Sequence, residues 1–415
     1  MIELPVSKLK VGFYVSRLDR PWTETPFPFQ GFEIESEEDL AQLRSLCNSV
    51  HVELSAAEAQ AYASRQPHPV EAPKKRADPL SDLSLLIDEQ SRGGPEKNPV
   101  PLKTELVKAK VVFGEAKKAV NDIFRRIRLG SGLDVTLLDT AMDSMVESVF
   151  RNRDALSWLA CMKRKDDYLY NHSLSSSVWA LAFGRHLGLD KDAIRIIGIG
   201  AMLLDIGKTS LPDGLLKSNA ALGPEDWNAM RTHVDKGVQL VQVEPMVDKR
   251  VLSMIATHHE RMDGSGYPHQ LKGDAIPLVG RIAGIVDCYD AMTSSRPHAK
   301  GKSTHEAVLE LKKLGGTWFQ TELIELFIQA VGVFPSGTLV ELNTGEIGVV
   351  VSQNRFRRLR PEVMMILDAQ KKLRDDFVVV DLQFREQTSA SGEALWITKA
   401  LEPGAYDIDP TEYFL

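Results

Sequence analysis

The chain has 415 residues, of which 43% are hydrophobic and 26% are charged, as in ordinary folded proteins. Its 50 Lys and Arg residues against 57 Asp and Glu residues give a net charge of −7, which argues against binding a nucleic acid polymer, because that needs clustered positive charge. The longest apolar run, residues 196–204, is too short for a membrane helix. With no visible signal peptide and three scattered cysteines, the sequence predicts a cytoplasmic protein without membrane insertion.

Residues 1–65 predict a small α+β domain. Residues 11–15 and 50–54 are rich in β-branched and aromatic side chains, which are typical of strands. Between them, residues 36–46 predict one short helix, because leucines recur there at helical spacing. Residues 66–104 follow as a Pro-rich linker, which is predicted to be disordered because it can bury little apolar surface.

Residues 105–334 predict an all-α domain, since apolar residues recur with a helical period almost throughout. The apolar stripe over residues 105–127 fits core packing and a homodimer contact equally well. The helices expected after it cover residues 133–150, 168–187, 191–204, 225–233, 235–241, 249–258, 278–292, 305–313 and 320–330.

Residues 335–415 predict a β-rich extension. Residues 338–342 and 346–352 flank a glycine-bearing turn, which is the pattern of a hairpin. Further strands are expected over residues 364–367, 377–382 and 396–401. The expected fold is therefore multidomain, with a central all-α helical bundle, a small N-terminal α+β domain and a small C-terminal β-rich appendage.

Ionisable side chains recur at the ends of predicted helices that are otherwise apolar. Burial of such groups is costly unless they are paired or bind a metal. Taken singly, each has a structural explanation: Asp205 could pair with Lys208, and Asp287 with Arg281 or Arg296. Together they are better explained as a mixed nitrogen and oxygen metal site, in which a carboxylate could bridge two ions. The candidate ligands are His172, Asp205, His233, His258, His259 and Asp287.

His258 and His259 are adjacent, and neighbouring side chains on a helix point about 100° apart. The two can reach one metal only if the helix ends at this point. Gly264 and Gly266, which follow shortly afterwards, support that ending.

The segment that begins with these histidines closely resembles the signature of HD-GYP domains. Residues 258–268 read HHERMDGSGYP, residues 203–208 read LLDIGK, and residues 286–297 read VDCYDAMTSSRP. The resemblance covers about residues 171–297. The first 65 residues are also similar to the small domain of unknown function that often precedes HD-GYP domains.

This resemblance implies an HD-type bundle that hydrolyses cyclic di-GMP to pGpG, GMP or both in bacterial second-messenger signalling. It implies that the six candidate ligands hold two divalent metal ions, bridged by Asp205, while such donors do not distinguish Fe, Mn, Ni and Zn. Asp205 and Lys208 are the expected catalytic residues. The loop over residues 266–268 is also expected to dock diguanylate cyclase domains. The expected substrate-binding residues are Lys208, Arg296, Gly266, Tyr267 and Pro268.

One departure from the family pattern affects the first metal site. Leu204 stands where the family has the histidine of its His-Asp pair, and leucine cannot coordinate a metal. The ion bound at this first site would keep three protein ligands, His172, Asp205 and Asp287. The other ion would keep Asp205, His233, His258 and His259. Two alternatives therefore stay open: a degenerate domain that binds nucleotide or protein partners without turnover, and another metal-dependent phosphohydrolase of the wider HD class.

Overall fold

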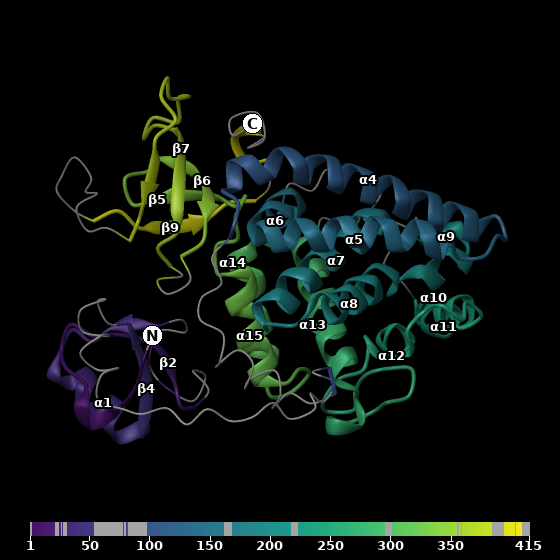
Figure 1. Cartoon of the computed structure of the whole chain (residues 1–415), viewed down its shortest axis with the longest axis horizontal. Helices are drawn as coiled ribbons and strands as arrows, with labels where there is room; N and C mark the ends of the chain where they lie inside the picture. The colour runs from purple at the N-terminus through teal and green to yellow at the C-terminus, as the bar shows by residue number, and fades with distance from the viewer. Residues whose placement is uncertain are drawn as a thin grey trace.

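The computed structural model describes residues 2–20, 25, 27, 31–53, 78, 80–81, 98–161, 168–216, 223–294, 301–354, 357, 359–383, 394–402 and 404–408. Figure 1 shows a large group of helices accompanied by an N-terminal and a C-terminal sheet. The expected fold class, a multidomain chain with a central all-α bundle, is confirmed. Among the described residues, no helix combines the length and the apolar character needed to cross a membrane.

The N-terminal unit is an antiparallel sheet with one helix. Its strands are β1 (Ile2–Pro5), β2 (Tyr14–Leu18), β3 (Phe32–Glu33) and β4 (Ser49–Glu53), in the order β1-β4-β2-β3. Helix α1 (Glu37–Leu46) begins as predicted, because the side chains of Ser36 and Asp39 cap each other's backbone amides. The sequence prediction missed β1 and placed β2 three residues early, since Gly12 at φ 93° forms a turn before the strand begins.

The helical bundle begins at Leu102 and contains most of the apolar core. Its first helices are α4 (Leu102–Arg128), α5 (Val135–Arg151), α6 (Arg153–Cys161), α7 (Tyr168–His186) and α8 (Lys191–Leu203). Shorter ones follow: η3 (Ile206–Ser210), α9 (Asp213–Leu216), α10 (Pro224–Arg231), α11 (His233–Val241) and α12 (Lys249–Thr257). The last are η4 (Gly273–Ala275), α13 (Leu278–Thr293), α14 (Thr304–Leu314) and α15 (Thr321–Val331).

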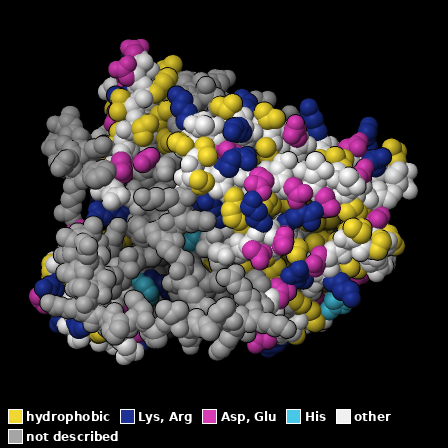
Figure 2. All heavy atoms as spheres, viewed as in Figure 1, with side chains coloured by type: hydrophobic (Ala, Val, Ile, Leu, Met, Phe, Trp, Pro, Cys, Tyr) yellow, Lys and Arg dark blue, Asp and Glu magenta, His cyan; other side chains and the backbone are white. Residues whose placement is uncertain are grey.

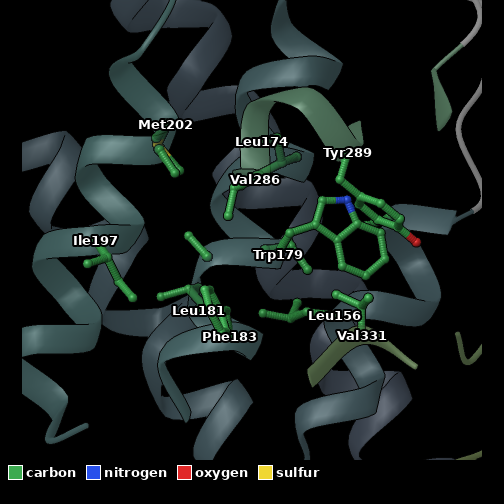
Figure 3. Close-up of a cluster of buried hydrophobic side chains, with 14 of the residues drawn as sticks. Leu156, Leu174, Trp179, Leu181, Phe183, Ile197, Met202, Val286, Tyr289 and Val331 are labelled. Atoms are coloured by element: carbon green, nitrogen blue, oxygen red, sulfur yellow. The ribbon is translucent and has the colours of Figure 1, made fainter. Parts of the chain in front are cut away.

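Aromatic rings join three of the long helices at the centre of the bundle. The rings of Trp179 on α7 and Tyr289 on α13 meet edge to face with centroids 5.3 Å apart, as Figure 3 shows. Phe327 on α15 makes similar contacts with Tyr289 at 5.2 Å and with Phe183 at 5.3 Å. Such pairs add to the stability that burial of the rings already provides. They fix α7 and α13, which each carry candidate ligands, against one another.

The C-terminal unit is an antiparallel sheet in the order β8-β7-β6-β5-β9. Its strands are β5 (Leu339–Leu342), β6 (Ile347–Ser352), β7 (Glu362–Leu367), β8 (Val379–Asp381) and β9 (Ile397–Ala400), close to the predicted ranges. Side chains alternate between two apolar clusters: Leu339 and Val349 pack on the helical core, whereas Val340 and Val350 face a smaller core of the unit. The appendage is thus packed against the bundle.

Part of the predicted linker also contacts the bundle. Leu80 is only 4% exposed and belongs to the helical core, and Asp78 accepts a hydrogen bond from Arg250 of α12 at 2.9 Å. Burying this apolar side chain offsets part of the cost of ordering the chain there. The domain boundaries at residues 65, 104 and 334 stay predictions.

A buried carboxylate ties α4 to α5. Glu105 is fully buried and accepts hydrogen bonds from Ser148 at 2.8 Å and from Arg151 at 2.7 and 2.8 Å. We expect Glu105→Ala to lower the free energy of unfolding by about 1–3 kcal/mol, because Ser148 and Arg151 lose their acceptor. Urea denaturation followed by circular dichroism measures this loss. Glu115→Ala, at an exposed position of the same helix, should change stability by less than about 0.5 kcal/mol; equal losses would contradict the prediction.

Candidate metal centre

All six candidate ligands lie in the described part of the chain and come from five separate segments. Each is fixed by a helix or a helix end. His172 lies on α7 and Asp287 on α13, while Asp205 links α8 to η3 and His233 begins α11. Helix α12 ends at Thr257 with His258 as its C-cap, and the ring centroids of His258 and His259 lie 4.0 Å apart. The predicted helix end is confirmed.

Four of these residues form a compact cluster, which we call the four-residue cluster. It consists of Asp205, His233, His258 and His259, whose ligand atoms all lie within 4.8 Å of one another. His233 Nε2 lies 3.4 Å from His258 Nε2 and 3.4 Å from Asp205 Oδ1.

Hydrogen bonds on the far side of two rings set the tautomers. His233 Nδ1 donates to the Met230 carbonyl at 2.7 Å, and His258 Nδ1 donates to the Ile255 carbonyl at 2.8 Å. In the neutral rings both Nε2 atoms therefore carry lone pairs, and these face each other and Asp205. Facing acceptors repel unless a cation lies between them, so the donor set fits a metal ion.

The electrostatics of the cluster favour neutral imidazoles beside an ionised carboxylate. Burial lowers the pKa of His233 to about 4, and burial also lowers the pKa of His258 and His259. Burial opposes ionisation of Asp205, but the charges of Lys208 and the surrounding histidines outweigh it and hold the pKa of that carboxyl well below its usual range.

The two carboxylate oxygens of Asp205 differ in their hydrogen bonds. Its Oδ2 accepts a hydrogen bond from Lys208 Nζ at 2.5 Å. Its buried Oδ1 accepts no hydrogen bond from any residue that the structure describes. An orphaned carboxylate oxygen facing imidazole lone pairs is a second observation that fits a metal ligand.

His172 and Asp287 lie beside the cluster and contact each other. His172 Nε2 lies 3.0 Å from Asp287 Oδ1 and 3.6 Å from Asp205 Oδ2, and His259 Nδ1 lies 3.9 Å from Asp287 Oδ2. Burial alone would lower the pKa of His172, but hydrogen bonds to Asp287 and Asp290 raise it to about 9. The structure therefore brings all six residues together, in two unequal groups.

Asp290 has a supporting position that the sequence analysis did not assign. Its Oδ2 lies 2.7 Å from His172 Nδ1 and accepts from Ser294 at 3.0 Å, while its Oδ1 accepts from Trp179 at 3.0 Å. Asp290 follows Asp287 by three residues on α13, so helical spacing was the available signal.

The loop over residues 266–268 lies directly against the cluster. Tyr267 stacks on His259 with centroids 4.6 Å apart, and a Cβ at Gly266 would lie 2.5 Å from the His259 carbonyl oxygen, so only glycine fits. Buried Glu260, also unassigned from sequence, accepts hydrogen bonds from the amides of His269 at 2.7 Å and Leu271 at 2.9 Å. These bonds hold the loop in place.

Two sequence predictions remain to be located. Arg296 lies outside the described residues. Leu204 is 2% exposed and belongs to the apolar core, so its side chain takes no part in the four-residue cluster.

Comparison with known families agrees with this geometry. The HD domain family matches residues 156–323, a domain of unknown function (DUF3391) matches residues 1–137, and a KOW domain associated with HD domains matches residues 339–403. The cyclic di-GMP phosphodiesterase PA4108 of Pseudomonas aeruginosa is 32% identical over 93% of this chain and 90% of its own length. The chain belongs to the HD-GYP family.

Two further relatives each match about a third of this chain. A cyclic di-GMP phosphodiesterase of Thermotoga maritima is 36% identical over 34% of this chain and 39% of its own length. A 3'3'-cGAMP-specific phosphodiesterase of Vibrio cholerae is 35% identical over 34% of this chain and 27% of its own length.

Gly207 allows η3 to approach α11 closely. A Cβ there would lie 1.9 Å from the His233 carbonyl oxygen and 2.5 Å from the Gly237 amide nitrogen. We expect Gly207→Ala to push Asp205 and His233 apart and to lower the metal content of the purified protein at least severalfold. Elemental analysis by mass spectrometry measures this. Gly214→Ala, where a Cβ meets nothing within 4 Å, is the control and should retain the wild-type metal content.

Proposed function

We propose that the chain is a metal-dependent phosphodiesterase that hydrolyses cyclic di-GMP to pGpG, GMP or both. The observation that carries this proposal is the four-residue cluster, whose facing Nε2 atoms and orphaned Asp205 oxygen fit a bound cation. The choice of substrate rests on the relative PA4108, because it aligns with nearly the whole chain. The 3'3'-cGAMP-specific relative aligns with about a third of it, so we place this substrate second.

We infer two ion positions that share Asp205. The first is the four-residue cluster, and the second would be held by His172, Asp205 and Asp287, where Leu204 leaves one ligand fewer. Fe, Mn, Ni and Zn all suit imidazole and carboxylate donors. A divalent cation held there supplies Lewis acidity toward a phosphate oxygen and lowers the pKa of water.

The chain's own residues would position the substrate. Lys208 uses one of its three donors on Asp205 and is partly exposed, so its other donors can reach a phosphate oxygen. Its positive charge would stabilise the negative charge that develops on the phosphate during hydrolysis. Asp290 would orient His172, and Glu260 would hold the 266–268 loop beside the site.

The degenerate alternative is less well supported than the enzyme. A domain released from catalysis would be expected to lose several ligands, whereas the four-residue cluster is complete. Docking of diguanylate cyclase domains at the 266–268 loop and formation of a homodimer stay predictions.

Asp205→Ala tests the bridging role. Removal of the carboxylate takes a ligand from both positions and leaves Lys208 without its partner. We expect metal content to fall to near zero and cyclic di-GMP hydrolysis to be lost, as measured by elemental analysis and by chromatography of pGpG and GMP. Asp213→Ala, on exposed α9, serves as control. Retention of two ions by Asp205→Ala would rule out the shared ligand.

Leu204→His tests the weakened position. An imidazole there would restore the missing ligand, so we expect the second equivalent of metal to bind at least tenfold more tightly. Leu204→Met keeps the apolar volume and should leave metal affinity unchanged. Titration of the metal-free proteins followed by elemental analysis measures both. If only Leu204→His hydrolyses cyclic di-GMP, the natural chain is not an enzyme for this substrate and the degenerate alternative holds.

A further inference from the structure

A row of neighbouring rings leads from the candidate metal centre to an exposed cation. The ring of His259 lies tilted against that of His258 with centroids 4.0 Å apart, and Tyr267 stacks on His259 with centroids 4.6 Å apart. The guanidinium carbon of Arg231 lies 5.1 Å from the centre of the Tyr267 ring. Arg231 is the last residue of α10 and is exposed to solvent. Its positive charge therefore lies within two ring contacts of a candidate metal ligand.

Arg231 differs from the other cations around this site. Lys208 donates to Asp205 at 2.5 Å, and Arg261 donates to the carbonyls of His258 at 3.0 Å and Glu260 at 2.8 Å. Arg231 has no carboxylate within ion-pair distance among the residues that the structure describes, and its contact is with the ring of Tyr267. Its guanidinium donors are therefore open to a ligand.

The position of the Arg231 guanidinium favours binding of an anion. A guanidinium this close to a cluster that holds a cation is repelled by it, and a bound anion would relieve that repulsion. The cation–π contact with Tyr267 holds the guanidinium over the ring without using its N–H donors in an ion pair. A planar fork of donors held in this way matches the oxygen pairs of a phosphate.

We propose that Arg231 binds the second phosphate of a cyclic dinucleotide whose first phosphate lies at the four-residue cluster. This assignment rests on the proposed function and extends it to a substrate class: phosphodiesters that carry a second phosphate. Both cyclic di-GMP and 3'3'-cGAMP belong to that class. Arg231 contacts phosphate in this arrangement and does not distinguish the bases.

The test compares a substrate with two phosphates and a substrate with one. Cyclic di-GMP is the first, and bis(p-nitrophenyl) phosphate, which has a single phosphodiester, is the second. We expect Arg231→Gln to lower kcat/KM for cyclic di-GMP about 10- to 100-fold, mainly through KM, and to change kcat/KM for bis(p-nitrophenyl) phosphate less than about twofold. Arg231→Lys should retain part of the affinity, because it keeps the charge. The metal content of both Arg231 variants should equal that of the wild type.

Three results would overturn the assignment. An equal loss with both substrates, or a loss of metal, would mean that Arg231 only holds Tyr267 and His259 in place. Unchanged hydrolysis of cyclic di-GMP by Arg231→Gln would mean that the second phosphate binds elsewhere. Failure of the wild type with both cyclic di-GMP and 3'3'-cGAMP would refute the proposed function itself, and the assignment with it. Arg125→Ala, an exposed arginine on α4, controls for the change in net charge.

Discussion

The candidate metal centre depends on two imidazole nitrogens that face each other across 3.4 Å beside a buried carboxylate. The backbone carbonyls of Met230 and Ile255 hold the outer nitrogens of these rings, so neither ring can turn its lone pair away. The free energy needed to bury such acceptors comes from the apolar core behind them, where rings on α7, α13 and α15 pack together. A centre built in this way is organised before any ligand arrives.

Charges of both signs are mixed over the described surface in view, so the positive charge offered to a substrate comes from individual side chains at the site. On the described part of the face shown in Figure 2, Lys and Arg alternate with Asp and Glu over the helices. A net charge of −7 does not hinder an anionic substrate when cations are placed at the site itself. Lys208 and Arg231 both precede the three clustered histidines in the chain, and they lie on η3 and α10.

Periodicity predicted most helices and strands to within a few residues, because long amphipathic segments carry a strong signal. It missed α6, a nine-residue helix that begins with Arg153 and Asp154, because the contacts of these buried charges with each other and with Asn98 cannot be read from the sequence. Motif resemblance predicted six candidate ligands, and the structure brings these residues together. It did not assign Asp290, Glu260 or Arg231, because their contacts depend on side-chain geometry: Asp290 meets a histidine 118 residues away, and Arg231 meets the ring of Tyr267.

Leu204 and Asp205 are adjacent but have different roles: Leu204 packs in the core, and Asp205 belongs to the candidate metal site. Leu204 closes α8 and fills the apolar core, while Asp205 turns its carboxylate into the centre. A histidine in place of this leucine would be desolvated, and only coordination would offset that cost. The leucine therefore stabilises the bundle whether or not a second ion binds. We therefore expect metal binding to depend first on the four-residue cluster, with His172 and Asp287 as its weaker extension.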